Sequence, residues 1–121
     1  MHKIKELKIW NKAIDLTVNV YNATEKFPKE EKFGLTPQIR RSAVSIPSNI
    51  SEGAGRNTNG EFRQFLGIAN GSAYELQTQL IISNRLELLD NKIVDPLLSE
   101  LEELQKMNYK LQQTLQNQTK Y

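Results

Sequence analysis

The sequence predicts an all-α fold: one antiparallel, up-and-down four-helix bundle with a left-handed twist. Apolar residues recur at alternating spacings of three and four along most of the chain, which places them on one face of successive helices. The connections between these segments are short, and no segment alternates as a strand does. The 121 residues suffice for a single domain with one core.

The first helix is predicted over residues 4–26. Its expected core stripe, spaced 3-4-3-4-3, consists of Leu7, Trp10, Ile14, Thr17, Tyr21 and Thr24. Phe27 and Pro28 end this helix, because the residue before a proline is pushed out of the helical region. A polar connection follows, through Gly34.

The second helix is predicted over residues 36–54, with Thr36 as N-cap and Pro37 in the first helical position. Its expected core stripe consists of Ile39, Ala43, Ile46, Ile50 and Gly53. We expect Gly53 and Gly55 to end it, because glycine readily adopts the left-handed conformation that closes helices.

Pro47 lies inside this second helix. A proline there removes the hydrogen bond to the carbonyl four residues earlier, that of Ala43, at a cost of about 3 kcal/mol. Two separate helices would interrupt the core stripe, so we expect one helix kinked at Pro47. Ser42 and Ser45 are positioned to bond the freed backbone groups.

The third helix is predicted over residues 58–89, opened by a capping box of Thr58 and Glu61. Its core stripe consists of Phe62, Leu66, Ala69, Ala73, Leu76 and Leu80. The other side carries Gly67, Ile68, Gly71, Ile82, Leu86 and Leu89. A helix that is apolar on two sides needs cover on both, and small residues four apart allow a close backbone approach. The second side therefore either packs within the chain or forms an oligomer interface.

The fourth helix is predicted over residues 95–117, with Asp95 as N-cap and Pro96 in the first position. Its coiled-coil-like stripe consists of Leu97, Leu101, Leu104, Asn108, Leu111 and Leu115. We expect the polar Asn108 to specify the register of helix packing.

Composition limits the possible functions. The chain has no cysteine, and His2 is its single histidine. Disulfides, thiolate metal sites and the usual nucleophile–base pairs are therefore excluded, and the Glu-x-x-His motifs of di-iron bundles are missing. Glu52 and Glu75 border the core stripes, and we interpret them as salt-bridge partners of Arg40, Arg41 or Arg63 that hold helix register. We expect no enzymatic activity, no metal and no cofactor.

No apolar run approaches the roughly 20 residues of a membrane span, and the N-terminus lacks the apolar block of a signal peptide. The composition, 38% hydrophobic and 25% charged, is that of an ordinary globular protein. These features predict a cytoplasmic protein without membrane contact.

The net charge of +2 is unevenly distributed: residues 1–63 carry +4 and residues 64–121 carry −2. A basic end and an acidic end of the bundle would explain this pattern. The candidate phosphate-binding residues are Arg40, Arg41, Arg56 and Arg63. Glutamates are interspersed among them, so the alternative is that these arginines are solvated or ion-paired.

Two long motifs give the chain a recognisable pattern. GLTPQIRRSAVSIPSNISEGAGR spans residues 34–56, and FRQFLGIANGSAYELQTQL spans residues 62–80. With Trp10, Ala13, Tyr21 and Phe27-Pro28 upstream, they resemble the four-helix bundle proteins, also called 23S ribosomal RNA intervening-sequence proteins. The resemblance extends to about Leu89.

The resemblance to this bacterial family implies an antiparallel four-helix bundle and a ring-like homopentamer, but no settled activity. A related branch, the accessory variability determinant of diversity-generating retroelements, is similar in bundle and pentamer and is a basic partner of reverse transcriptase and RNA. We therefore carry two hypotheses. The first is a homo-oligomer that binds RNA or DNA through backbone phosphates without base specificity. The second is a scaffold that presents an oligomeric surface to a protein partner.

Overall fold

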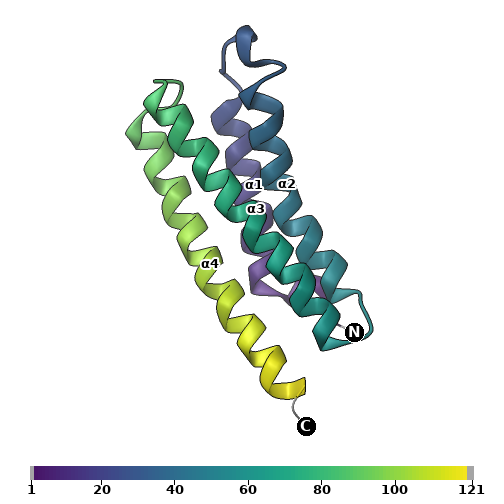
Figure 1. Ribbon diagram of the computed structural model, residues 1–121. Helices are drawn as coiled ribbons and strands as arrows, with labels where there is room; N and C mark the ends of the chain where they lie inside the picture. The colour runs from purple at the N-terminus through teal and green to yellow at the C-terminus, as the bar shows by residue number, and fades with distance from the viewer. Residues whose placement is uncertain (1, 120–121) are drawn as a thin grey trace.

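The protein is all-helical, as the sequence predicts. The computed structural model describes residues 2–119 and has no strand within them (Figure 1). The four long helices are α1 (Lys8–Thr24), α2 (Leu35–Ala54), α3 (Asn59–Arg85) and α4 (Asn91–Thr119). Two short 3-10 turns precede α1 and α2: η1 (Ile4–Glu6) and η2 (Lys29–Glu31). Within the described range, no helix is long and apolar enough to cross a membrane.

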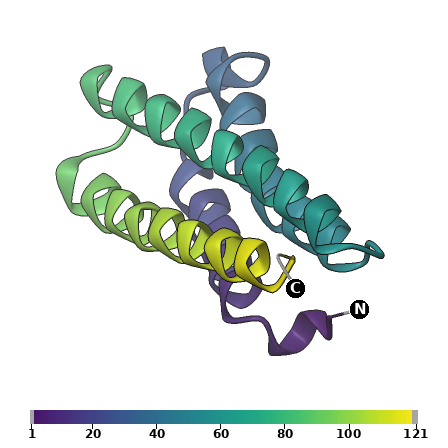
Figure 2. The same ribbon diagram turned by 60° about the horizontal axis from the view of Figure 1, so that its bottom comes forward.

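The helices lie side by side, and the chain turns back at each connection (Figures 1 and 2). Each helix packs against two others, in the cyclic order α1, α2, α3, α4. Hydrogen bonds between helices pair rising residue numbers with falling ones, as in Ser42 with Glu75 and Ser45 with Ser72. This arrangement is that of a four-helix bundle, whereas the left-handed twist stays a prediction.

The core stripes predicted for α2, α3 and α4 are buried, except that Leu111 is half-buried. Asn108 lies among them, and its Nδ2 donates to the carbonyl of Leu66 at 2.9 Å. A buried amide without this partner would cost roughly 1–3 kcal/mol, so the bond ties the register of α4 to that of α3.

The stripe predicted for the first helix is wrong in part: Thr24 is buried and Leu7 and Trp10 are half-buried against the core, but Ile14 and Tyr21 are exposed. The buried residues of α1 are Ile9, Ala13, Leu16, Val20 and Thr24. Ile14 and Tyr21, which the 3-4 spacing placed inside, are 36% and 40% exposed. The α1 sequence is apolar over more than one stripe, and the positions of α2 and α4 decide which stripe they cover. The helix also begins later than predicted, at Lys8, because Leu7 is extended.

The start of α2 differs from the prediction by one residue. The helix begins at Leu35, and Thr36 lies inside it without a capping bond. A carboxylate upstream does the capping instead, since Glu31 Oε1 accepts the Leu35 N–H at 3.1 Å. Proximity in the folded connection therefore outweighs the intrinsic preference of threonine for the N-cap.

Pro47 lies within one continuous helix, as predicted, while a kink there stays a prediction. The carbonyl of Ala43 lacks the usual donor at Pro47 and lies 3.1 Å from Thr17 Oγ1 of α1, whose single hydrogen is also within reach of the Ala13 carbonyl at 2.8 Å. Ser42 and Ser45 do not serve this backbone, because their hydroxyls bond Glu75 and Ser72 of α3. The proline is accommodated by packing between helices.

The glycines at the end of α2 do not act through a left-handed conformation, because Gly55 has φ −83°. Gly53 permits close packing instead. A Cβ there would lie 2.7 Å from Phe65 Cβ and 2.9 Å from Phe62 Cδ1. Half of the predicted capping box after this turn is confirmed, since Thr58 Oγ1 accepts the Glu61 N–H at 3.1 Å, while the Glu61 carboxylate accepts the Thr58 hydroxyl at 3.0 Å and not the Thr58 N–H.

The boundary between α3 and α4 was predicted too late in the chain. α3 ends at Arg85, and the turn includes Glu87 with φ 63°. Asp90, rather than Asp95, caps α4, because its Oδ1 accepts the Ile93 N–H at 3.1 Å. Pro96 is therefore inside the helix, on an exposed side where water can satisfy the freed carbonyl of Lys92.

Candidate nucleic-acid interface

The four arginines predicted to bind phosphate do not converge on one surface. Arg40 and Arg41 lie in the first third of α2, whereas Arg56 follows its last turn and Arg63 lies at the start of α3. At 1.5 Å per residue, the two pairs are roughly 24 Å apart along the helix axis. The structure thus separates them into an upper pair, near the connection at the top of Figure 1, and a lower pair.

Arg40 of the upper pair has a structural role. Its Nε donates to Thr24 Oγ1 at 3.0 Å and its Nη2 donates to the carbonyl of Tyr21 at 3.2 Å. The guanidinium carbon also lies 4.5 Å from the centroid of the Tyr21 ring. These contacts bind the end of α1 to α2, so Arg40 contributes charge to the site from a fixed position.

Arg41 lies beside Arg40 in a hollow of about 520 Å³ at the start of α2. We call it the basic hollow. Its lining residues are Tyr21, Lys32, Thr36, Pro37, Arg40, Arg41 and Val44. Three are cations and none is a carboxylate. Arg41 is exposed and forms no ion pair with any residue in the range 2–119.

The local backbone adds to the positive potential of the basic hollow. Thr36 and Pro37 belong to the first turn of α2, where unpaired N–H groups and the helix dipole favour an anion. Two carboxylates are nearby: Glu31, whose Oε1 faces the Leu35 N–H, and Glu75, which lines an adjacent hollow with Arg41 and accepts the Ser42 hydroxyl. The arrangement is suited to a phosphate group: a planar guanidinium, a mobile ammonium and a hydroxyl around one opening.

The lower pair differs because its cations already have neighbours. Arg56 Nη2 lies 3.7 Å from Glu52 Oε1, and its guanidinium carbon is 4.8 Å from the centroid of the Phe65 ring. The Nε of Arg63 is buried, without a hydrogen-bond partner in the part of the chain described.

The predicted partners of the two glutamates are wrong. Glu52 pairs with Arg56, four residues later on the same face, and not with Arg40, Arg41 or Arg63. Glu75 accepts the Ser42 hydroxyl at 2.6 Å and forms no ion pair with a described residue. The helix-to-helix contacts of α2 and α3 therefore rest on small polar groups and apolar packing.

Sequence reasoning missed Lys32 and Tyr21 as members of the site. Lys32 precedes Arg40 by eight residues and belongs to a connection, so no helical periodicity links the two. Tyr21 was placed in the core stripe of α1. A usable signal was the excess of basic residues around this connection, where residues 25–41 hold five Lys/Arg and three Glu.

The uneven charge lies across the bundle and not along it. Each half of the sequence forms a helical hairpin that runs the length of the molecule, so the basic half is the α1–α2 side and the acidic half the α3–α4 side. Lys12 Nζ and Glu103 Oε2, 2.6 Å apart, bridge the two sides. The predicted basic and acidic ends are therefore replaced by a basic and an acidic side.

The predicted oligomer interface is exposed over most of its residues. A Cβ added to Gly67 or Gly71 would meet no atom within 4 Å. Ile68, Ile82 and Leu86 are 49%, 42% and 59% exposed. Nothing within the described chain covers this surface, which we call the outer α3 face, consisting of Gly67, Ile68, Gly71, Ile82 and Leu86. Leu89 does not belong to it, because the chain turns at Glu87 and buries Leu89 in the core.

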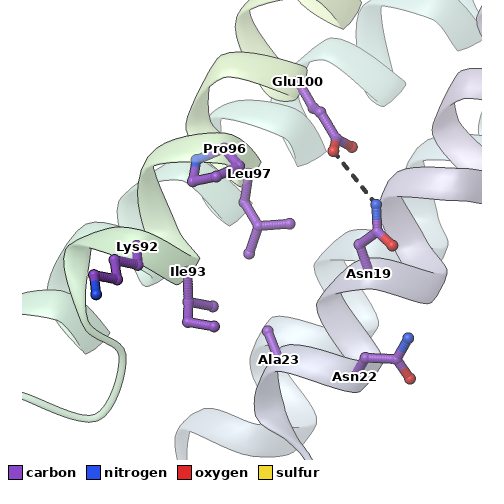
Figure 3. Close-up of a pocket in the computed structure, with 8 residues that line it drawn as sticks. All are labelled: Asn19, Asn22, Ala23, Lys92, Ile93, Pro96, Leu97 and Glu100. Atoms are coloured by element: carbon purple, nitrogen blue, oxygen red, sulfur yellow. Dashed lines mark hydrogen bonds between the residues drawn. The ribbon is translucent and has the colours of Figure 1, made fainter.

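A second concave site lies between α1 and α4 (Figure 3). This groove of about 330 Å³ has Ala23, Ile93 and Leu97 among its apolar walls. At one end Asn19 Nδ2 donates to Glu100 Oε1 at 3.3 Å. It holds one lysine and one carboxylate and no nucleophile–base pair. Elsewhere, within the described chain, no group of three or more His, Asp or Glu residues is placed to hold a metal ion.

Comparison with known proteins places this geometry in a family. The model of the 23S rRNA-intervening sequence protein family matches residues 5–110. A crystal structure of a protein of unknown function from the S23 ribosomal protein family of Bacteroides thetaiotaomicron superposes with a TM-score of 0.76 at 23% identity, covering 86% of this chain and 97% of that chain. This structural similarity supports the four-helix fold described above. Among curated proteins, none matches the sequence significantly. The family match spans most of the chain, and the protein therefore belongs to the 23S rRNA-intervening sequence protein family.

Proposed function

We propose that the protein is a non-enzymatic homo-oligomer, a ring of five bundles, that binds RNA through its backbone phosphates at the basic hollow. The observation that carries this proposal is the set of cations around one opening without a carboxylate among its lining residues. Sequence-independent binding of nucleic acid rests on such contacts to phosphate. The proposal places the protein in the cytoplasm.

The roles of the residues follow from their contacts. Arg41 is unpaired within the described range and can bind two phosphate oxygens at once, while Lys32 supplies a flexible point charge. Arg40 raises the local potential while it remains bound to Thr24 and Tyr21. Arg56 and Arg63 are not part of this site.

A ring accounts for how a chain of net charge +2 can bind a polyanion. Each subunit would repeat the basic hollow, and several hollows along one bound strand would act together, which raises the effective concentration at every further contact. The isolated bundle would offer only one weak phosphate site.

The surface supports assembly through two different faces. One is the outer α3 face, and the other is the exposed side of α1 that carries Ile14 and Val18, of which Val18 is 53% exposed. Rings form when one patch of a subunit meets a different patch of the next, whereas a two-fold dimer needs only one patch. Two unlike apolar faces on one bundle therefore favour a ring.

The RNA proposal is tested by fluorescence anisotropy with a labelled single-stranded RNA at several salt concentrations. We expect wild-type binding to fall steeply with salt, and the double variant K32Q/R41Q to bind at least about tenfold more weakly with a shallower slope. The matched control is R56Q/R63Q, which removes the same charge from the lower pair and should change affinity less than about twofold. Salt-independent binding, no binding at low salt, or equal losses in both variants would refute the proposal.

The assembly proposal is tested by light scattering after size exclusion. We expect a pentameric mass for the wild type and a smaller mass for G71L, because a leucine would hold the neighbouring subunit away from the outer α3 face. Gly71 has open space around it within the chain, so the variant should still fold, which circular dichroism checks. A monomeric wild type, or a pentamer unaffected by G71L, would contradict this use of the face.

A protein-interaction scaffold is the second candidate, and the exposed outer α3 face is the observation that favours it. In this case the face would bind a different protein and not a second copy. Recovery of one defined partner after nuclease treatment, lost in G71L but not in K32Q/R41Q, would support the scaffold. Recovery of RNA alone would exclude it.

A further inference from the structure

Phe33 is the most exposed large hydrophobic side chain of the described residues, at 90% exposure. It lies in the connection between α1 and α2, at the top of Figure 1. A single exposed aromatic residue is not unusual on a protein surface, so exposure alone assigns it no role. Its position is informative because its neighbour in the chain, Lys32, lines the basic hollow.

Lys32 connects the ring to the hollow directly. Its Nζ lies 5.6 Å from the centroid of the Phe33 ring, a cation–π distance. The ammonium group thus lies over one face of the ring, and at 90% exposure the other face is open to solvent. An aromatic face and a phosphate-binding group are therefore presented within one residue of each other.

The backbone on both sides of Phe33 is held in place. The Lys32 N–H donates to the carbonyl of Lys29 and the Gly34 N–H donates to the carbonyl of Glu31, each at 3.0 Å. The connection is also tight at Gly34, where a Cβ would lie 2.8 Å from Glu31 Oε1. Such a turn presents the ring in advance of binding and lowers the entropy lost when a ligand stacks on it.

We propose that Phe33 is a stacking platform for an unpaired nucleobase whose neighbouring phosphate is bound in the basic hollow. The inference rests on the proposed function and specifies its ligand class as single-stranded nucleic acid. A base can stack on a protein ring only when it has left its own stack, so the platform favours single strands over duplexes. The hollow by itself would bind phosphates of either form.

The surroundings of Phe33 favour a nucleic acid over an apolar protein surface. The exposed residues beside it in the chain are charged: Lys29, Glu30 and Lys32. Protein docking sites bury a contiguous apolar patch, which these neighbours do not supply. Alternating aromatic and basic groups are the pattern that binds single strands.

The test compares single-stranded RNA with a duplex of the same sequence, by fluorescence anisotropy at one low salt concentration. We expect F33A to bind the single strand about tenfold more weakly and the duplex within about twofold of wild type. F33W should retain single-strand binding, whereas F33L, which is apolar but not aromatic, should lose it as F33A does. The matched control is Y109A, which removes another exposed aromatic side chain, 64% exposed and beside Lys110, from the opposite side of the bundle.

A second readout follows the ring itself. The natural Trp10 is half-buried, so RNA should quench the fluorescence of F33W more strongly than that of the wild type. Equal quenching in the two proteins would overturn the inference, because it would leave residue 33 out of contact with the bases.

The outcomes separate this inference from the proposed function. If K32Q/R41Q loses RNA binding while F33A binds single strand and duplex as the wild type does, the stacking role is wrong and the phosphate site stands. A change of oligomeric mass in F33A would instead make Phe33 a subunit contact and overturn the inference. If the wild type binds no RNA, the proposed function fails and the platform fails with it.

Discussion

A pair of arginines lies near each end of α2, in opposite settings: Arg40 and Arg41 within the helix, and Arg56 and Arg63 after it, the latter on α3. At the upper end, Arg41 lies in the basic hollow with Lys32 and without an acidic partner in the described chain. At the lower end, Arg56 lies near Glu52 and Phe65, and the Nε of Arg63 is buried. Arginine content alone therefore does not locate a phosphate site, because neighbouring carboxylates and packing decide which guanidinium is available.

The two ends also differ in how α2 meets its neighbours. At the upper end a long polar side chain, Arg40, spans from α2 to α1. At the lower end Gly53 lets α2 approach α3 closely. An open upper end and a tightly packed lower end should respond differently to substitution, in stability and in binding.

The largest stability effect is expected at the lower end, for G53A. The added Cβ would lie within 3 Å of Phe65 Cβ and Phe62 Cδ1, so the helices must separate or strain, at a cost of about 3 kcal/mol. The control is G55A, because a Cβ there finds its nearest atoms at 3.6 and 3.7 Å and φ is negative. Urea unfolding measures both, and equal stability of the two variants would contradict the close-packing role of Gly53.

The next largest loss of unfolding free energy is expected for Arg40→Ala, at the upper end of α2. It removes two hydrogen bonds and the contact with the Tyr21 ring, so we expect a loss of about 2 kcal/mol in unfolding free energy. Arg41→Ala, its neighbour without an ion pair in residues 2–119, should change stability by less than about 0.5 kcal/mol and weaken RNA binding instead. The same denaturant series checks both, and the reverse order would exchange the roles assigned to the two arginines.

Glu52→Gln tests whether the lower arginines fail to bind RNA because a carboxylate neutralises their charge. The pair with Arg56 is long and exposed, so unfolding free energy should change by less than about 0.5 kcal/mol. Loss of the carboxylate should slightly strengthen RNA binding at low salt, because Arg56 is then unopposed. An RNA affinity that stays unchanged in the anisotropy titration would show that the residues of the lower end are not arranged to bind a phosphate, even when Arg56 is not neutralised.

The smallest effect concerns a reference pair away from both ends, Lys12 with Glu103 on the α1–α4 side. The Lys12 ammonium, through its hydrogen bond and its charge, lowers the pKa of Glu103 below the ordinary value of 4.5. A carboxylate whose pKa is lowered in the folded state stabilises the fold fully at pH values above its unfolded-state pKa. This contribution is lost as the pH falls through the folded-state pKa. The thermal unfolding midpoint of K12M should therefore be slightly below that of the wild type at pH 7 and equal to it in acid. A difference in midpoint that persists in acid would instead indicate that Lys12 stabilises the fold through packing.

The core stripes of α3 and α4 were predicted correctly, although α3 also carries apolar residues on its outer side. Phe62, Leu66 and Leu76 of α3 and Leu101 and Leu104 of α4 are buried as expected. The core stripe of α1 was predicted wrongly in part. On α1 both stripes are apolar, and Ile14 and Tyr21 were assigned to the core although Ile9 and Leu16 occupy it.

Helix ends were less predictable than helix faces, because side chains compete for the same backbone groups. Asp90 and Asp95 both suit an N-cap, and a proline follows only Asp95, yet Asp90 caps α4. Likewise, Glu31 and not Thr36 bonds the first N–H of α2. The choice depends on which side chain the folded connection brings within reach.

The sequence by itself determined the helical class, the family and most of the core, because helical periodicity and the run of motif residues are local properties. Only the tertiary structure decided that Thr17 lies beside the carbonyl freed by the proline in α2, that Arg40 joins α1 to α2, and that Lys32 and Arg41 share a hollow. These contacts join residues from different elements. Their distances depend on how the helices pack, and the spacing of residues along one helix does not contain that information.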